Sequence, residues 1–471
     1  MPHIERKKPD LTEGPILSRI ILFSLPLILT GILQLLFNTA DVIVVGRWGD
    51  TATATASTGL AAVGACGSLT GLLVNLFIGL SVGAGVCVAH AIGARDEERV
   101  HRTVHTAVLL SLIGGVIVTL LGVFLARPLL SLMNTPRAVL DEAVPYMRAY
   151  FYGMPASMLY NYCAAMLRSE GDTSRPLVFL SIAGVVNVGL NLIMVLVFHL
   201  GAMGVGIATA ASQWVSAILI LLYMLRYDGY CRIDLKKLHV DRKSLKKILA
   251  IGIPAGLQSS LFALSNVVIQ SSVNSLGETV IAGNAAASNL DGYIYIAQNA
   301  LYHAAMTFVG QNVGAKKPER IKKAMLCCIV VVAIVGFSVG SLVLLLGEPL
   351  LSLYVSGGSA DRSAVLAAGM VRLSTMGLTY FLCGVMDVGN GILRAFGRSI
   401  SPMMITLTGS CLLRIVWIAT VFRTHQTQEI IYYSYPISWF LTAVALYILV
   451  FFTHRAFKRT LPGNPIPIKA L

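Results

Sequence analysis

The sequence predicts an all-α polytopic membrane protein of twelve transmembrane helices, arranged as two six-helix lobes that repeat one another. Composition predicts the membrane class: of 471 residues 56% are hydrophobic and only 12% are charged, and the mean hydropathy is +0.76. A soluble domain has too few core positions to bury so many apolar side chains. The lengths of the apolar stretches predict the helices, and an internal repeat predicts the two lobes.

Apolar stretches of about 20 or more residues alternate with short polar segments, which favours helical spans over a barrel, whose strands would alternate polar and apolar residues. The first stretch is too long for the core of a signal peptide, so we expect an uncleaved first span. The predicted spans are residues 18–46, 53–92, 98–126, 141–167, 175–198, 203–225, 245–275, 279–313, 319–346, 366–395, 400–422 and 430–454.

The distribution of positive charge predicts the orientation. With the N-terminus inside, 28 of the 36 Lys and Arg residues fall in cytoplasmic segments, seven in external ones, and Arg414 lies deep in a span. The positive-inside rule then places both termini on the cytoplasmic side. We expect the protein in a bacterial-type cell (inner) membrane. We interpret the net charge of +14, and above all the basic cluster at 226–247, as contact with anionic membrane lipids and not with nucleic acid.

Enzyme chemistry has no support in the sequence motifs. The chain has no Walker A sequence, no HExxH and no Gly-rich dinucleotide fingerprint, and its eight cysteines include no CxxC pair. We therefore expect no enzyme and no cofactor, apart from a coupling ion in the case of a transporter.

An internal repeat relates the two halves of the chain. Three matches occur in the same order, separated only by small insertions or deletions, which is hard to obtain by chance. They pair SLPLILTGILQLLFNTA (24–40) with GIPAGLQSSLFALSNVV (from 252, offset 228), IGARDEERV (92–100) with VGAKKPERI (313–321, offset 221), and LRSEGDTSRP (from 167) with LRAFGRSISP (from 393, offset 226).

Each copy holds six spans, an even number, so both copies enter the membrane from the same side, as in transporters whose two lobes rock around a site. The expected division is an N-lobe at 1–226, a basic cytoplasmic linker at 227–243 and a C-lobe at 244–471. Pro26 and Pro254 occupy matching places in the first span of each lobe and favour a helix bend there. The bend is either fixed packing geometry or a point where the helix changes shape.

A polar stripe on the first span marks a candidate site. An ionised group in the bilayer is costly, so Asp41 is a functional candidate. At 100° per residue, Thr30, Gln34, Asn38 and Asp41 fall within about 80° of one another, so the stripe faces a cavity or a partner helix and not lipid.

Depth brings other polar side chains to Asp41. At 1.5 Å per residue, Asp41, Asn191 and Thr209 lie roughly 8 to 10 Å below the outer edge, and Asn187 lies one turn deeper than Asn191. One carboxylate, two amides and a hydroxyl suit Na⁺ binding through oxygen atoms, or proton exchange near neutral pH because desolvation disfavours the charged carboxylate. A static hydrogen-bond cluster joining spans one, five and six is the alternative.

The C-lobe has its own polar residues at membrane depth. Asp291 and Arg414 both lie near mid-depth, which suits a buried ion pair. His303 and Asp387 lie in the inner halves of spans eight and ten, with Asp387 within reach of the Arg414 side chain. Together these four residues form either a proton-carrying network or a neutralised structural cluster.

The pattern resembles a known family. Twelve spans in two repeats, SLPLILTGILQLLFNTADVIVVGR at the start, the GAR and GAK loops after spans two and eight, FVGQNVGA at 308–315 and LRSEGDTSRP resemble the multidrug and toxic compound extrusion (MATE) family, in its DinF-like branch. The resemblance implies cation-coupled efflux, in which H⁺ or Na⁺ moves inward while an amphipathic, often cationic, organic compound leaves.

The resemblance also implies a coupling site in the first lobe, which by position falls on Asp41, Asn187, Asn191 and Thr209. The chain departs from the family at one of these positions, because the second acid on span five is replaced by Asn191. Asp41 is then the only negative charge of the site. The family's other main branch has a Glu on span seven, and the matching LQSSLFALSN has no acid, so coupling through the C-lobe would depend on Asp291 or Asp387.

We therefore expect a monomeric, cation-coupled antiporter that exports organic drugs or other xenobiotics by alternating access. Its partners would be a small organic substrate and membrane lipids, with no nucleic acid. The alternative is a flippase for a lipid-linked saccharide or another lipid of the same superfamily, although such proteins often have two more spans and several cationic residues in the cavity. Neither the substrate nor the choice between H⁺ and Na⁺ follows from the sequence.

Overall fold

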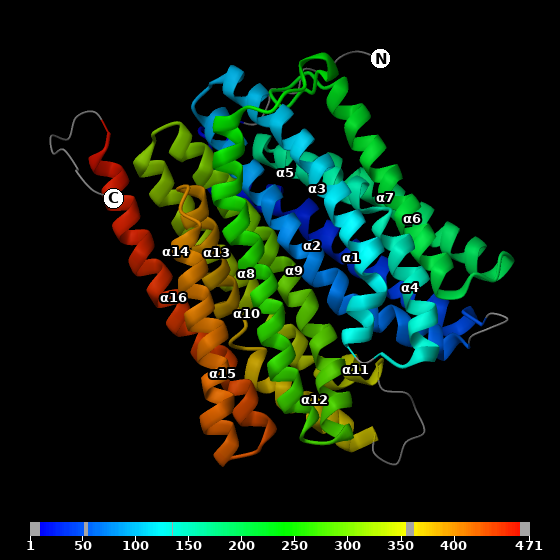
Figure 1. The fold of residues 1–471 in the computed structure, drawn as a ribbon. Helices are drawn as coiled ribbons and strands as arrows, with labels where there is room; N and C mark the ends of the chain where they lie inside the picture. The colour runs from blue at the N-terminus through cyan, green and yellow to red at the C-terminus, as the bar shows by residue number, and fades with distance from the viewer. Residues whose placement is uncertain (1–9, 51–54, 134, 355–361, 462–471) are drawn as a thin grey trace. The chain divides into compact units, whose positions relative to one another are not determined.

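The structure is a computed structural model, which describes residues 10–50, 55–133, 135–354 and 362–461. This part of the chain contains helices and no strand (Figure 1). Nine of its helices are long and apolar enough to cross a membrane, and a tenth span follows if the bent pair of helices α12 and α13 counts as one. These observations confirm the all-α polytopic class.

The first half of the chain forms seven α-helices. Helix α6 continues directly into a π-helical turn, η1, and α4 and α5 together occupy the single span predicted at 141–167. The bounds are α1 Ile16–Trp48, α2 Ala56–Gly93, α3 Glu97–Leu132, α4 Arg137–Phe151, α5 Met154–Glu170, α6 Ser174–Leu192, η1 Ile193–Val197 and α7 Gly201–Leu225.

The second half begins with a 3₁₀ turn, η2, in the linker. Its tenth predicted span is broken into α12 and α13, bent by 49°, and its eleventh is a continuous run in which α-helix alternates with π-helix. The bounds are η2 Leu235–Lys237, α8 Arg242–Asn274, α9 Glu278–Gly314, α10 Pro318–Leu345, α11 Gly347–Ser352, α12 Arg362–Met376, α13 Phe381–Ala395, α14 Ile400–Thr406, η3 Leu407–Leu412, α15 Leu413–Trp417, η4 Ile418–Phe422 and α16 Gln428–Arg459.

The chain folds into two compact units, and their boundaries lie inside α1 and α8. Unit 1 contains Leu29–Ser260, and unit 2 contains Asp10–Ile28 together with the chain from Leu261 on. The first half of α8 therefore packs with the first repeat, and the first half of α1 packs with the second. The lobe boundaries predicted at the linker describe the sequence repeat and stay a prediction.

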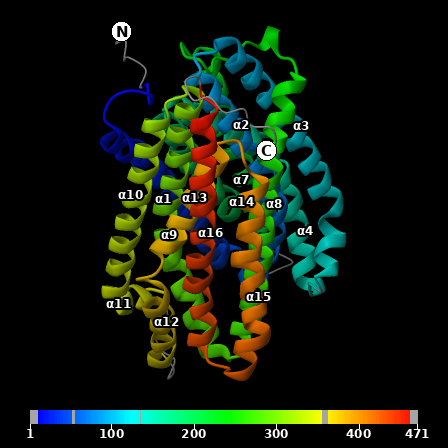
Figure 2. The ribbon, with the colours of Figure 1, turned by 90° about the vertical axis from the view of Figure 1, so that its left-hand side faces the viewer.

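The second helix of each repeat lies at the centre of its unit. In unit 1, α2 contacts α3, α4, α5 and α7, and in unit 2, α9 contacts α10, α11, α12 and α13. Figure 2 shows α16 running beside α13 and α14 in unit 2. The two repeats thus build the same kind of bundle around corresponding helices.

Backbone conformation at the helix ends repeats as well. Arg95 and Lys316, 221 residues apart, both have a φ of 56°. Gly171 and Gly397, 226 residues apart, have φ values of 100° and 83°, which glycine adopts without a side-chain clash. The offsets equal those of the sequence matches, so matching residues end matching helices in the two halves.

Close glycine contacts hold α2 against the first half of α8 within unit 1. A Cβ at Gly79 would lie 2.2 Å from the nitrogen of Gly256, and a Cβ at Gly83 would lie 2.3 Å from the carbonyl oxygen of Ile248. Such contacts leave no room for a side chain, so the two backbones approach as closely as small residues allow.

Candidate functional site

The polar residues predicted from depth form one hydrogen-bonded cluster in unit 1. Asn191 of α6 donates through Nδ2 to Asp41 Oδ1 of α1 and to Asn187 Oδ1, the latter at 3.2 Å. Asn187 in turn donates to the hydroxyl of Thr209 on α7 at 3.5 Å, and that hydroxyl also hydrogen-bonds the Asp41 carboxylate. The four side chains predicted to lie together therefore do so.

One oxygen of this cluster has no partner among the described residues. Asn191 is fully buried, and its Oδ1 accepts no hydrogen bond from the described chain. The oxygens of Asp41 and Asn187 can only accept, so the Asn191 amide must turn its nitrogen toward them, and this fixes where its oxygen lies. A buried acceptor without a donor is costly unless something else satisfies it. The Asp41 carboxylate, the Asn191 side-chain oxygen and the Thr209 hydroxyl are oxygen ligands of the kind that a hard cation such as Na⁺ takes. The carboxylate can accept a proton instead.

Packing fixes the helices that carry the cluster. The ring of Phe37, one turn before Asp41, lies where a side chain at Gly184 of α6 would be, 1.8 Å from its ideal Cβ. Beyond the cluster, Val44 and Val45 of α1 pack with Val195 and Val205 in a fully apolar group. The carboxylate therefore lies between two tightly packed contacts of α1.

A π-helical turn begins two residues after Asn191. It covers Ile193–Val197 and continues α6 without a break. Such turns are uncommon and occur frequently at functional sites. The sequence reasoning did not find it, because no residue pattern in this apolar segment distinguishes π-helix from α-helix.

The rest of the polar stripe does not enter the cluster. Gln34 and Asn38 are exposed on α1, and the hydrogen bonds of the Asp41 group do not include them. Their supporting role stays a prediction.

In unit 2 the structure corrects the predicted pairing of Asp291 with Arg414. Asp291 of α9 instead pairs with Arg372 of α12, whose Nε and Nη2 both lie 2.8 Å from Oδ2. Arg372 also donates to Asn284 Oδ1 at 2.7 Å, and the Tyr432 hydroxyl donates to the same oxygen at 3.1 Å. Asp291 is 3% and Arg372 9% exposed, so this is a buried ion pair with an amide and a phenol attached.

Arg414 is surrounded by aromatic rings. Its Nε donates to Ser438 Oγ at 2.8 Å, and its guanidinium lies 4.2 Å from the ring centre of Tyr435 and 5.5 Å from that of Trp439. It is 1% exposed, and its Nη2 has no hydrogen-bond acceptor among the described residues. Cation–π contacts therefore stabilise this charge in place of the predicted carboxylate.

The other two members of the predicted C-lobe network lie on separate helices. Asp387 is half-buried on α13, and His303 is half-buried on α9, with its ring 5.0 Å from that of Tyr302. Their part in ion coupling stays a prediction.

Arg372 is the residue of unit 2 that sequence reasoning missed. Its signal was present, since it is an Arg inside the predicted span 366–395. The described part of the helix that carries it starts at Arg362, four residues before the predicted start of the span. That shift brings Arg372 to about 15 Å from the start of its helix, close to the depth of about 20 Å for Asp291, at 1.5 Å per residue.

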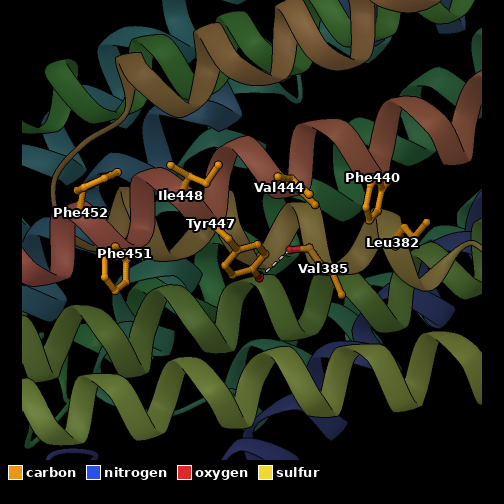
Figure 3. Close-up of a pocket in the computed structure, with 9 residues that line it drawn as sticks. Leu382, Val385, Phe440, Val444, Tyr447, Ile448, Phe451 and Phe452 are labelled. Carbon is orange, nitrogen blue, oxygen red and sulfur yellow. Dashed lines mark hydrogen bonds between the residues drawn. The ribbon is translucent and has the colours of Figure 1, made fainter.

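An apolar pocket of about 640 Å³ lies elsewhere in unit 2, between α13 and α16 (Figure 3). Its lining is apolar except for the hydroxyl of Tyr447, which donates to the Val385 carbonyl at 2.9 Å. Phe451 and Phe452 are more than half exposed beside it. None of its lining residues belongs to the polar sites described above, so this pocket is separate from them. No group of three or more His, Cys, Asp or Glu suited to a metal ion occurs among the described residues.

Comparisons with known proteins agree with the two repeats. A family model described as MatE matches residues 26–193 and again residues 254–420, with starts 228 residues apart. The "Probable multidrug resistance protein YoeA" of Bacillus subtilis is 26% identical over 446 residues, covering 90% of this chain and 91% of its own. The "FAD transporter" of Shewanella oneidensis is 26% identical over 413 residues, covering 85% and 87%.

Solved structures share the fold. One described as the outward-facing conformation of a multidrug resistance MATE family transporter has a TM-score of 0.88 at 22% sequence identity, over 96% of this chain and 99% of that one. A likeness at this identity shows a shared fold, and the predicted twelve-helix, two-lobe fold is consistent with it.

Proposed function

Because the chain belongs to the MATE family, a family of multi-pass membrane transporters and not of enzymes, we propose that it is a cation-coupled antiporter that exports amphipathic, often cationic organic compounds. The single observation that supports this most is the buried cluster around Asp41. It combines one carboxylate with two amides and a hydroxyl, and no donor among the described residues satisfies the Asn191 side-chain oxygen.

The proposed mechanism depends on the charge of Asp41. With the carboxylate ionised, the site holds one negative charge in a largely apolar surrounding. That charge favours the conformations of the transporter in which a cation can reach Asp41. Binding of H⁺ or Na⁺ from outside neutralises that charge, so the two states of the transporter differ in their affinity for the ion. An ion shifts a conformational equilibrium only by this difference in affinity.

We propose that Pro26 and Pro254 are the points where α1 and α8 change shape. Each lies inside its helix, where proline removes a backbone hydrogen bond. The unit boundaries follow two residues after Pro26 and six residues after Pro254. A helix whose halves belong to different units needs a pliable point near the junction when the units move.

The remaining expectations extend the proposal. Both termini and the linker 227–243 would face the cytoplasm, the N-lobe and C-lobe would be the moving bodies, and the transporter would act as a monomer in a bacterial-type inner membrane. The coupling ion is H⁺ or Na⁺, and no other cofactor is required.

A second candidate substrate class is favoured by Arg414. This buried guanidinium has aromatic neighbours, and its Nη2 has no acceptor within the described chain. Such a group suits an anionic compound with an aromatic ring. One relative is named as an FAD transporter, and FAD is such a compound. Export of an anionic, ring-containing compound is therefore the alternative to export of cationic drugs.

The test is efflux from proteoliposomes that contain the purified protein, with a fluorescent cationic dye and, separately, with FAD. An inward gradient of H⁺ or of Na⁺ is imposed in turn. We expect one of the two gradients to drive efflux by the wild type and by Asp228→Asn, an exposed linker residue, and neither to drive it in Asp41→Asn. Equal gradient-driven efflux by Asp41→Asn would rule out the proposed coupling site. Transport of lipid-linked saccharide without either compound would favour the flippase.

A further inference from the structure

A second polar pocket lies in unit 1, away from the Asp41 cluster. Its volume is about 120 Å³, and it is formed where α3 and α8 begin, next to α2. Positively charged and hydroxyl side chains make up most of its lining. The lining residues are Cys87, Arg99, Arg102, Thr103, Asp241, Lys243, Ser244 and Lys247.

The pocket carries a large excess of positive charge. Four of the lining residues are cationic and one is acidic, which leaves three net positive charges. Arg102 shares its charge with Glu98 at 3.7 Å. Among the described residues, Arg99, Lys243 and Lys247 have no carboxylate within 4 Å. The positive end of the α8 helix dipole adds to this field.

The acid in the pocket is already engaged. Asp241 caps α8 by accepting the backbone N–H of Ser244 at 2.7 Å, and this hydrogen bond holds the pKa of Asp241 below its ordinary value. Its own backbone N–H donates to the Thr106 hydroxyl at 2.9 Å. The carboxylate therefore closes the helix end, and it offsets only part of the charge of the nearby Arg102 and Lys243.

The walls of the pocket are fixed. The buried hydroxyls of Thr103 and Ser244 lie 3.3 Å apart and join α3 to α8. The linker is held on the same side, because the Asp234 N–H donates to His105 at 3.0 Å and the Glu170 carboxylate accepts the N–H groups of Tyr230 and Cys231, each at 3.1 Å. A rigid frame therefore presents the cations to the cavity.

The internal repeat shows what cations at these positions bind in the other half of the chain. By the offsets of 221 and 228, Arg99 corresponds to Arg320 and Lys247 corresponds to Arg19. In unit 2, Arg320 and Arg19 both donate to the carbonyl oxygen of Glu13 at 2.6 Å, and Arg320 also donates to the Leu11 carbonyl.

In unit 1 the corresponding carbonyl oxygen is already engaged within the backbone. The residue that corresponds to Glu13 is Asp241, whose carbonyl oxygen accepts the N–H of Leu245 at 2.8 Å inside α8. Arg99 and Lys247 line a cavity instead. The same pair of cations thus has chain oxygens as partners in one unit and an open space in the other.

We propose that this pocket binds a phosphate group, with Arg99, Arg102, Lys243 and Lys247 as its counter-charges and the Thr103 and Ser244 hydroxyls as further donors. Arg and Lys together match the several oxygen acceptors of such an anion. The chemistry fits a phosphodiester of an anionic lipid headgroup as well as a free phosphate.

The position of the pocket bears on the source of that phosphate. Arg99 and Lys247 lie in the first two turns of α3 and α8, two helices apolar and long enough to span a membrane. Headgroup phosphates lie at that level, just outside the hydrocarbon, and basic pockets between such helices bind anionic lipids.

The experiment uses the purified full-length protein in detergent micelles. Phosphatidylglycerol or phosphatidylcholine is titrated in, and bound lipid is counted by native mass spectrometry, with the thermal unfolding midpoint as a second measurement. Sodium phosphate is compared with sodium chloride at equal ionic strength. The pocket variant is Arg99→Gln/Lys247→Gln, and the control is Lys236→Gln/Lys246→Gln, which removes two exposed linker and α8 charges outside the pocket.

We expect phosphatidylglycerol to bind and stabilise the wild type and the control. Its apparent affinity should fall about 30-fold in the pocket variant, which is about fivefold for each of the two cations lost near a headgroup. Stabilisation by sodium phosphate alone, lost in the same variant, supports the site and assigns free phosphate as its occupant. An unchanged affinity in the pocket variant, or equal binding of both lipids, overturns the proposal. Should the double variant not fold, the single variant Lys247→Gln, which changes an exposed side chain, should show a smaller loss of phosphatidylglycerol affinity.

Discussion

The substitution Asn191→Asp tests whether the Asp41 cluster is a cation site or a static hydrogen-bond cluster. Asn191 Nδ2 donates to both Asp41 Oδ1 and Asn187 Oδ1. The variant has nearly the same shape, but it replaces this double donor with an acceptor. Two carboxylates then face each other in a buried position, in the arrangement that the DinF-like branch of the family implies.

The expected magnitude follows from the geometry. Two unit charges about 4 Å apart repel by about 4 kcal/mol at an effective dielectric constant of about 20. A cation or proton bound between them removes that repulsion, so the affinity of the site for a monovalent cation rises by up to about a thousandfold. Without a cation the folded variant is destabilised, and saturation with one stabilises it by about 2.7 kcal/mol at a hundred times its dissociation constant.

The assay is thermal unfolding of the purified protein at pH 8 in choline chloride and in sodium chloride of equal ionic strength, and again at pH 6. We expect the midpoint of Asn191→Asp to lie below that of the wild type in choline at pH 8, and to recover with Na⁺ if the site binds Na⁺, or only at pH 6 if it binds a proton. The control Asn274→Asp adds the same charge at the exposed end of α8. A variant whose midpoint responds to Na⁺ and pH no more than this control does would refute the reasoning and leave the static cluster.

Three further predictions concern the frame around the sites. Arg372→Gln leaves its buried carboxylate partner without a counter-charge, so unfolding should cost about 3 to 5 kcal/mol less, as measured in denaturant; an unchanged midpoint would contradict the buried pair. Glu170→Gln weakens the anchor of the linker, so the buried thiol of Cys231 should react faster with a maleimide at unchanged expression, and equal rates would count against the anchor. Gly79→Ala forces a methyl group against the backbone of α8 and should lower the free energy of unfolding by at least about 1 to 3 kcal/mol. A Cβ at Gly64 meets no atom within 4 Å, so Gly64→Ala should be tolerated. Equal stability of the two variants would refute the close contact.

The sequence predicted most of the helices and the first-lobe cluster for a physical reason. Apolar runs are long enough to be counted, and a straight helix has a fixed rise and rotation per residue. Depth alone therefore brought Asp41, Asn187, Asn191 and Thr209 together. These residues lie within the regular part of their helices, where counting is accurate.

Counting failed where helices begin early, bend or change period. The described part of the tenth span starts at Arg362 and bends by 49° before α13. Arg372 was not considered, and Arg414 was taken as the partner of Asp291. The eleventh span contains two π-helical turns, η3 and η4, which rotate the residues that follow. Arg414 lies after the first of these turns, so a helical period of 3.6 residues could not predict the direction of its side chain.

The exchange of half-helices between the units has a consequence for biosynthesis. Unit 1 needs residues up to Ser260, and unit 2 includes Asp10–Ile28. During synthesis the first bundle therefore stays incomplete until the chain has passed the linker, and the earliest helical turns wait for partners made last. A gene cut at the linker would yield two fragments, and each would lack a helical segment of its own bundle. The two halves therefore have to be made as one chain, although they repeat each other.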